Sequence, residues 1–299
     1  MSTEISPTAF PELLQRLDRM LDLFERTMNS TASDADEVVF ASAIAFSWQR
    51  REGGGHFRPI KHPDVMQLEY LLGIDRQREA LVRNTRQFLC GVPANHVLLW
   101  GERGTGKSSV IKALLQRFAG DGLRLVQVHR HDLLDLPEMI DRLWDRPEYF
   151  ILFCDDLSFE EDDAEYKELK ALLEGGLTAR ARNVLVYATS NRRHLMPEHM
   201  ADRQLVFEGD EVHPNEAIEE KLSLADRFGI RLGFYAVDQR TYLEIVHHLA
   251  EIRCLQVDLA VLDREALRWS LSYSGRSGRS ARQFIDDLEG RLAMDNMQN

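Results

Sequence analysis

Cysteine is scarce in this sequence, and long apolar runs are missing. Three cysteines stand among 299 residues, at Cys90, Cys154 and Cys254, and their spacing fits neither a disulfide framework nor a zinc site. No apolar run approaches the roughly 20 residues that a membrane helix needs, and the first residues lack the basic and then apolar order of a signal peptide. We therefore expect a cytoplasmic protein with reduced thiols and no membrane segment.

Positive charge is also in short supply. Lysine and arginine together number 37, against 49 aspartate and glutamate residues, so the formal net charge is −12. Proteins that bind nucleic acid usually present a basic surface, so a protein partner is favoured over a nucleic acid. The hydrophobic fraction of 44% suits a globular protein with a sizeable core. The length of 299 residues allows about two domains plus an extension.

Residues 101–108 are the stretch around which the sequence is organised, and they read Gly-Glu-Arg-Gly-Thr-Gly-Lys-Ser. This is the phosphate-loop pattern, in which glycines let backbone N–H groups wrap a polyphosphate at the N-terminus of a helix. An apolar run at 97–100 predicts the strand before the loop, and apolar residues at helical spacing over 110–118 predict the helix after it. The alternative is a glycine-rich turn that binds nothing, but it explains neither flank.

The residue types in the loop indicate its ligands. In a phosphate loop, Lys107 reaches the β- and γ-phosphates of the nucleotide, and the Ser108 hydroxyl ligates Mg²⁺. We therefore expect ATP and Mg²⁺ as cofactors. The predicted nucleotide-binding residues of this stretch are Gly101, Glu102, Arg103, Gly104, Thr105, Gly106, Lys107, Ser108 and Ser109.

A second motif is the pair of acids that ends the apolar run 150–154. An acid at the carboxyl end of a parallel strand points into the crevice where ligands of open sheets bind. Asp155 is predicted to hold Mg²⁺, and Asp156 to polarise the water that attacks the γ-phosphate. The alternative is that both carboxylates only cap the next turn.

Apolar runs and helical patterns alternate along the middle of the chain. Strands are expected at 97–100, 125–128, 150–154, 184–188 and 230–235, and helices at 75–88, 110–118, 136–144, 164–174 and 217–225. The alternation predicts an α/β fold with a parallel sheet and helices on both faces, over residues 56–236. Only helical patterns follow, so residues 237–299 are expected to form a small α-helical lid domain.

The first 55 residues are predicted to form a helical extension. Residues 11–27 have an amphipathic helical pattern, residues 37–49 are too apolar to be free, and residues 50–55 resemble a linker. We expect the extension to pack on its own chain, with binding to a partner as the alternative. After an extended approach over 57–64, Asp75 is predicted to cap the helix before the loop.

With these motifs, residues 65–295 resemble the AAA+ ATPases. Gly73 and Ile74 look like the segment that this family places beside the adenine. Asn191, after the fourth predicted strand, looks like the sensor-1 residue that contacts the γ-phosphate or the attacking water. The whole set is similar to a family of bacterial AAA+ proteins known mainly as predicted ATPases, so the resemblance supplies a mechanism but no client.

Two arginines complete the resemblance. Arg227 resembles the arginine finger that the family offers to a neighbouring subunit, and Arg279 resembles the sensor-2 residue that opens a helix of the lid domain. Rivals for these two roles are Arg192 and Arg193 for the finger, and Arg276 and Arg282 for sensor 2. The resemblance implies a homo-oligomer, either a ring or an open ring, in which hydrolysis depends on assembly.

Asp156 departs from the family pattern, which has glutamate at this position. Aspartate is one methylene shorter and would hold the water less well, although Glu160 or Glu161 could substitute. The leading hypothesis is an oligomeric ATPase that remodels or loads a macromolecular client. The alternative is an ATP-dependent switch or scaffold with weak hydrolysis. A small-molecule kinase would share the phosphate loop but requires neither the sensor and finger residues nor a lid domain.

Overall fold

The computed structural model describes residues 40–51, 54–159, 163–174, 181–192, 195, 206–208, 211–213, 224–273 and 275–298. The helices predicted over 11–27 and over most of 217–225 lie outside these residues, as do Glu160, Glu161 and Arg193. Among the residues described, no helix combines the length and the apolar character that crossing a lipid bilayer requires.

A seven-stranded sheet forms the centre of the fold, in the order β2-β1-β4-β5-β6-β3-β9. Its strands are β1 (Ala45–Arg51), β2 (Gly54–Pro59), β3 (Val97–Gly101), β4 (Leu123–Val128), β5 (Tyr149–Cys154), β6 (Val184–Ser190) and β9 (Ile230–Phe234). All neighbouring pairs in this sheet are parallel except β1 and β2. The predicted parallel sheet is thereby confirmed. A separate antiparallel pair consists of β7 (Val206–Glu208) and β8 (Glu211–His213).

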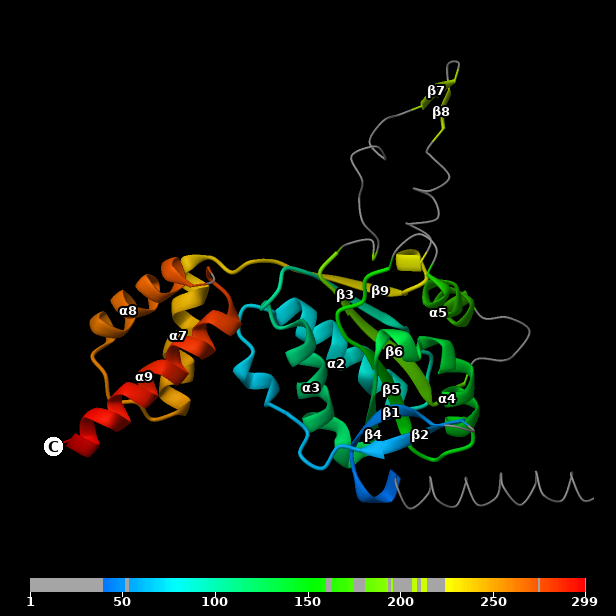
Figure 1. Ribbon diagram of the computed structural model, residues 1–299, viewed down its shortest axis with the longest axis horizontal. Helices are drawn as coiled ribbons and strands as arrows, with labels where there is room; N and C mark the ends of the chain where they lie inside the picture. Colours follow the sequence, from blue (N-terminus) through cyan, green and yellow to red (C-terminus); the bar gives the residue numbers. More distant parts are fainter. Residues whose placement is uncertain are drawn as a thin grey trace, which may run out of the picture.

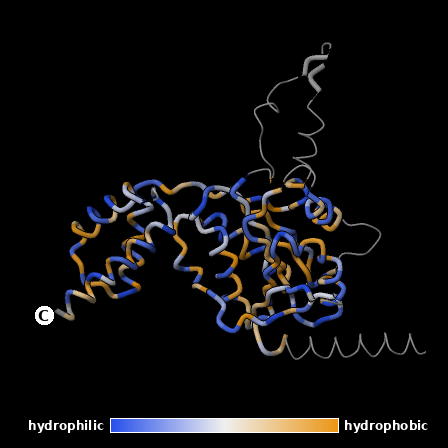
Figure 2. Tube along the Cα trace, viewed as in Figure 1, coloured by the Kyte–Doolittle hydropathy of each residue, from blue (hydrophilic) through white to orange (hydrophobic). Residues whose placement is uncertain are grey.

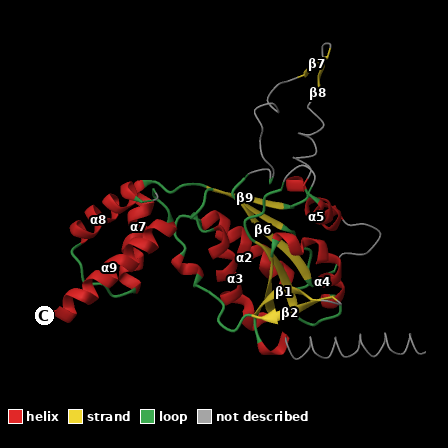
Figure 3. Cartoon of the chain, in the orientation of Figure 1, coloured by secondary structure: helices red, strands yellow, loops and turns green. Residues whose placement is uncertain are grey.

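Helices cover both faces of the sheet, as the alternating pattern predicts (Figure 1, Figure 3). On one face lie α2 (Asp75–Leu89) and α3 (Lys107–Phe118), and on the other lie α4 (Leu136–Leu143) and α5 (Ala164–Glu174). Successive residues of β3 point to opposite faces, so Leu99 joins the core under α2 and α3 and Leu98 joins the core under α4 and α5. Figure 2 shows the apolar residues concentrated along the strands between these helix layers.

The last part of the chain is helical, with a core of its own. It consists of α7 (Gln239–Ile252), α8 (Leu259–Ser272) and α9 (Gly278–Gln298). Tyr242, Ala266 and Phe284, one from each helix, are buried together. The Asp238 carboxylate caps α7, because it accepts a hydrogen bond of 2.8 Å from the Thr241 backbone. Three short 3-10 helices, η1 (Leu68–Tyr70), η2 (Ala119–Asp121) and η3 (Arg130–Asp135), connect elements elsewhere.

The predicted helical extension is wrong over residues 45–51 and 54–55, which belong to the sheet. β1 pairs in parallel with β4 and antiparallel with β2, so the described residues of the predicted linker, 50–51 and 54–55, are strand residues that pair with each other. Phe46 and Trp48 of β1 are at most 1% exposed, and Trp48 packs edge-on against Phe57 with ring centroids 4.9 Å apart. This two-residue period suits a strand, and the pairing with β4 stabilises it.

Asp75 is the first residue of α2 and not its N-cap, which corrects a second prediction. The cap position is taken by Ile74, and the Asp75 carboxylate accepts a hydrogen bond from the Arg78 side chain instead of from the backbone. The Ile74 side chain is buried in the core under α2 and α3. This anchoring places the start of the helix one residue earlier than the capping pattern indicates.

The strand order also brings the motif-bearing strand ends together. β3, β6 and β5 are adjacent in that order and all run the same way. After β3 the chain crosses through α3 to β4, which lies beyond β6 and β5 in the sheet. The next two strands, β5 and β6, then fill the positions back toward β3, whereas β9 is added on the other side of β3. The order of the strands therefore reverses around β3. Such a reversal opens a crevice at the carboxyl ends of the strands.

Candidate nucleotide-binding site

The phosphate loop turns between β3 and α3 on three glycines in the left-handed region. Gly101, Gly104 and Gly106 have φ angles of 135°, 79° and 99°, which residues with a Cβ rarely adopt. At Gly101, a Cβ would also lie 1.9 Å from the carbonyl oxygen of Phe234 on β9. The loop therefore requires glycine for its shape, and it leaves a cradle at the N-terminus of α3 that fits a polyphosphate.

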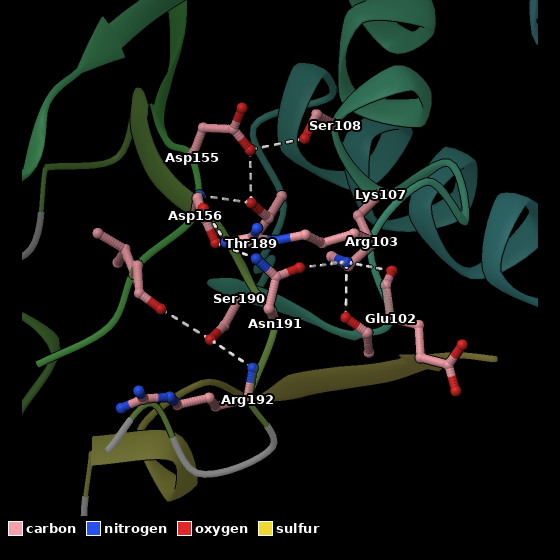
Figure 4. A network of polar contacts seen from close by, with 12 residues as sticks. Glu102, Arg103, Lys107, Ser108, Asp155, Asp156, Thr189, Ser190, Asn191 and Arg192 are labelled. Carbon is pink, nitrogen blue, oxygen red and sulfur yellow. Dashed lines mark hydrogen bonds and ion pairs between the residues drawn. The ribbon is translucent and has the colours of Figure 1, made fainter. Parts of the chain in front are cut away.

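Lys107 opens α3 and folds its side chain back over the loop. Its Nζ donates to the carbonyls of Gly101 and Glu102 over 2.7 Å each and to Oδ1 of Asn191 over 3.2 Å. These bonds use all three donors of the ammonium group. The Thr105 hydroxyl donates to the same Glu102 carbonyl over 2.8 Å and braces the turn. Lys107 is thus positioned inside the loop, within reach of a group bound in the cradle (Figure 4).

Four charged side chains surround Lys107. Burial lowers the pKa of its ammonium group, and the carboxylates of Asp156 and Asp155 oppose that effect. The guanidinium groups of Arg279 and Arg103 lower the pKa further, so the net shift is downward. The carboxylates of Asp155 and Asp156 are therefore accompanied by three cations: Arg103 of the loop, Lys107 of α3 and Arg279 of α9. A bound polyphosphate would be stabilised by this arrangement of charge.

Asp155 follows β5 and accepts hydrogen bonds from two hydroxyl groups. Ser108 Oγ and Thr189 Oγ1 each lie 2.6 Å from Asp155 Oδ1. Carboxylate and hydroxyl oxygens are suitable Mg²⁺ ligands, and Mg²⁺ in such sites usually keeps waters and phosphate oxygens as well. No group of three or more His, Cys, Asp or Glu side chains arranged for a metal occurs among the described residues. An ion at Ser108 and Asp155 would therefore depend on phosphate and water oxygens.

Asp156 has a left-handed backbone with φ 53°, which costs on the order of 1 kcal/mol or more for a residue with a Cβ. Its backbone N–H donates to Thr189 Oγ1 over 2.8 Å, and its Oδ1 accepts a hydrogen bond from Asn191 Nδ2. Its Oδ2 lies 3.7 Å from a guanidinium nitrogen of Arg103. Backbone strain held by surrounding contacts is typical of functional sites. Asn191, predicted as a sensor, thus joins Asp156 to Lys107.

Thr189 is a site residue that sequence reasoning missed. It accepts the Asp156 backbone bond and donates to Asp155, so a single hydroxyl fixes both predicted acids. One signal was present: Thr189 is a polar residue at the end of an apolar strand, two positions before Asn191. Residues two apart in a strand point the same way.

The lid helices contact the loop at the start of α9. The backbone N–H of Arg279 donates to the Gly104 carbonyl over 3.3 Å. A Cβ at Gly104 would lie 3.0 Å from Ser277 Oγ. The absence of a side chain at Gly104 therefore permits the close approach of the start of α9 to the phosphate loop. The predicted sensor-2 residue therefore lies beside the phosphate loop through its backbone, and its guanidinium charge acts on Lys107.

The predicted adenine segment, at the start of α2, also lies close to the loop. Ile74 is buried, and its Cδ1 lies 4.0 Å from the position that a Cβ at Gly106 would take. Gly73 has φ 76°, and a Cβ there would come within 2.7 Å of Thr241 on α7. Gly73 and Ile74 thus lie between the phosphate loop and the lid helices. Ser109, the last predicted loop residue, is half-buried in the first turn of α3.

Arg227 lies apart from this cluster. A guanidinium nitrogen pairs with Glu174 Oε1, 2.7 Å away, at the C-terminal end of α5. Arg227 also comes just before β9, hence at the amino-terminal edge of the sheet, whereas the phosphate loop follows the carboxyl end of the adjacent parallel strand β3. A strand of five residues such as β9 spans roughly 16 Å. The predicted finger therefore lies at the opposite edge of the sheet from the loop of its own chain.

The described rival arginines have other contacts. The Arg192 side chain points away from the phosphate loop, and its backbone N–H donates to Ser190 Oγ over 3.0 Å (Figure 4). A guanidinium nitrogen of Arg276 donates to Gln239 Oε1 over 3.3 Å. The charge of Arg282 adds to the effect of Lys112 in lowering the pKa of Asp64, a residue outside the loop cluster.

The class of protein follows from the strand order together with the loop. Parallel strands in the order β4-β5-β6-β3-β9, a phosphate loop after β3 and lid helices against that loop define a P-loop fold of the AAA+ type. The chain belongs to the family described as "Protein of unknown function (DUF815)", whose model matches residues 41–292.

Two solved structures resemble the chain weakly. The Thermotoga maritima RuvB Holliday junction branch migration motor is 13% identical, with a TM-score of 0.45, over 74% of this chain and 72% of that chain. A DNA replication initiation factor is 16% identical, with a TM-score of 0.47, over 79% of this chain and 68% of that chain. Among curated proteins, none matches the chain.

Proposed function

We propose that the chain binds MgATP in the phosphate loop and hydrolyses it. The observation that carries this proposal is one connected network. Lys107 Nζ, Asn191 and Asp156 form a continuous chain of hydrogen bonds beside Asp155, whose Oδ1 accepts the Ser108 hydroxyl at 2.6 Å. Three separate strand ends contribute to it. Such convergence of a cation, two acids and an amide is what phosphoryl transfer needs, because the protein mainly positions and stabilises charge.

Each residue has a role in this proposal. Lys107 would neutralise the β- and γ-phosphates, and Ser108 with Asp155 would hold Mg²⁺, which would supply positive charge that stabilises the transferring phosphoryl group. Asp156 and Asn191 orient the attacking water. Gly73 and Ile74 border the adenine, and the lid contributes Arg279.

The proposed active form is a homo-oligomer, either a ring or an open ring. Arg227 lies at the edge of the sheet opposite to the loop of its own chain, which supports a role toward a neighbouring subunit. A finger supplied in this way would make hydrolysis depend on assembly. The proposed work of the oligomer is to remodel or load a macromolecule. The net charge of −12 favours a protein client over a nucleic acid.

A second candidate is an ATP-dependent switch or scaffold with weak hydrolysis. Asp156 favours it, because this carboxylate is shorter than glutamate and is already bonded to Asn191 and near Arg103. An acid engaged in this way is less available to orient a water. The switch would bind ATP and change its assembly without fast turnover.

Calorimetric ATP binding and steady-state phosphate release separate the two candidates. The wild type, Lys107→Ala and Asp156→Glu form the set, with circular dichroism as the folding control. Under the ATPase proposal the wild type binds and turns over ATP, whereas Lys107→Ala binds ATP about a hundredfold more weakly and shows no turnover. Binding without turnover, with turnover appearing in Asp156→Glu, would favour the switch. A folded wild type that binds no ATP would overturn both candidates.

A further inference from the structure

Arg103 is a loop residue whose type the phosphate-loop pattern leaves free, yet its side chain is directed into the site. Its guanidinium nitrogen Nη2 lies 3.7 Å from Asp156 Oδ2, and both side chains are largely exposed, at 75% and 57%. Figure 4 shows Arg103 reaching from the loop across to Asp156, close to Asn191. After burial of Lys107 and together with Arg279, the charge of Arg103 also lowers the pKa of the Lys107 ammonium group.

The position of Arg103 matters because of what surrounds it. The cradle at the N-terminus of α3 suits the inner phosphates, and Asp155 with Ser108 marks the metal side. Asp156 and Asn191 stand at the strand ends facing the loop, where a terminal phosphate and its attacking water belong under the proposed function. Arg103 spans the same space from the loop side.

The ion pair between Arg103 and Asp156 is suited to exchange. At 3.7 Å and with both partners largely exposed, such a pair contributes little to stability. A guanidinium group binds phosphate through two parallel hydrogen bonds, which are stronger than a long exposed ion pair. A γ-phosphate would therefore draw Arg103 away from Asp156. ADP lacks that phosphate and would leave the pair in place.

We propose that Arg103 distinguishes ATP from ADP by exchanging Asp156 for the γ-phosphate. This inference rests on the proposed function, because it places the γ-phosphate beside Lys107. In the free site Arg103 restrains the carboxylate of Asp156. With ATP the guanidinium moves to the phosphate, and Asp156 is released to orient the water. The loop thus couples recognition of the third phosphate to readiness for hydrolysis.

The test is calorimetric binding of MgADP and of the magnesium complex of a non-hydrolysable imido analogue of ATP. Arg103→Ala is compared with the wild type and with Arg240→Ala. The control also removes an exposed arginine, one that is paired with Glu244 at 2.9 Å on α7. We expect Arg103→Ala to lose about tenfold to a hundredfold in affinity for the analogue and less than about twofold for ADP. Arg103→Lys should recover only part, because lysine keeps the charge without the fork.

Two results would overturn the proposal. Equal losses for ADP and the analogue would mean that Arg103 supplies general charge, and unchanged affinities for both would make it a bystander. Failure of the proposed function is distinguishable, because the wild type would then bind neither nucleotide.

A double-mutant cycle tests the exchange itself. Asp156→Asn removes one partner of the pair, so the analogue no longer has to draw Arg103 from a carboxylate. The affinity gain from Asp156→Asn should be larger when Arg103 is present than in the Arg103→Ala background. Equal gains in the two backgrounds would contradict the exchange, because simple repulsion between Asp156 and phosphate acts in both. Thermal melts of all four proteins serve as the folding control.

Discussion

The two edges of the parallel sheet present arginine to carboxylate in different ways. At the carboxyl edge, Arg103 belongs to a connected cluster whose central cation, Lys107, is 7% exposed. At the amino edge, Arg227 pairs only with Glu174 among the contacts described, and the two side chains are 45% and 37% exposed. Exposed pairs contribute only about 0–1 kcal/mol. The comparison teaches that one edge is built as a connected cluster around a buried lysine, and the other carries an arginine that can change partner at little cost.

Replacing the exposed arginine at the amino edge should have the largest effect. Under the trans-finger proposal, Arg227→Ala should reduce ATP turnover by about a thousandfold or more. ATP affinity should stay unchanged, because the variant leaves the loop of its own chain intact. Turnover and calorimetric binding are measured on the same samples.

The matched control for Arg227 is Arg231→Ala, which removes a nearby exposed arginine paired with Asp226. Mixing Arg227→Ala with Lys107→Ala should recover part of the activity, since one subunit supplies a pocket and the other a finger. Light scattering with and without ATP reports assembly. A monomer that turns over normally would show that the amino edge takes no part in hydrolysis.

Lys107→Ala tests the carboxyl edge of the sheet, because it removes the central cation of the cluster there. ATP affinity should fall by about a hundredfold, since charged hydrogen bonds of this kind contribute about 1.5–3 kcal/mol each. The fold should survive, as circular dichroism will report. Unchanged affinity in a folded variant would remove the assignment of the phosphate loop.

Asp155→Asn should act on the metal more than on the nucleotide. A neutral amide is a poor ligand for a hard cation, so the Mg²⁺ concentration required for hydrolysis should rise by at least about tenfold. Nucleotide binding without Mg²⁺ should persist. Asp155 would be no more than a turn cap if magnesium titrations of the variant and the wild type coincided.

The smallest expected effect concerns an exposed ion pair outside both clusters, and it measures how much such a pair stabilises the fold. Lys112 Nζ lies 2.9 Å from Asp64 Oδ2, outside both clusters. The hydrogen bond and charge of Lys112 lower the pKa of Asp64. The stabilisation is therefore present above the unfolded pKa of about 3.9 and is lost as the pH falls through the lower folded pKa.

Asp64→Asn should accordingly lower the free energy of unfolding at pH 7 by about 0.2–1 kcal/mol. High salt should shrink this difference by screening. Urea denaturation of both proteins at low and high salt measures it. A loss well above this range would show that exposed pairs in this chain matter more to stability than the comparison of the two edges assumes.

The sequence by itself determined the elements that depend on local pattern. Glycines at positions that need positive φ, an apolar run before them and a helical period after them give the loop, β3 and α3. The helix predicted over 164–174 matches α5, and the apolar run 150–154 lies within β5. Strand and helix periods are properties of neighbouring residues, so a single chain segment suffices to predict them.

Only the tertiary structure decided which distant residues meet. Residues 45–51 became a strand because β4 offered a parallel edge, and no local pattern specifies a partner that lies 80 positions away. The hydrogen bonds that Thr189 Oγ1 donates to Asp155 and accepts from the Asp156 backbone likewise depend on the adjacency of β5 and β6. The separation of Arg103 and Arg227 between the two edges follows from strand direction. Two arginines look alike in sequence, and the sheet decides which carboxylate each one faces.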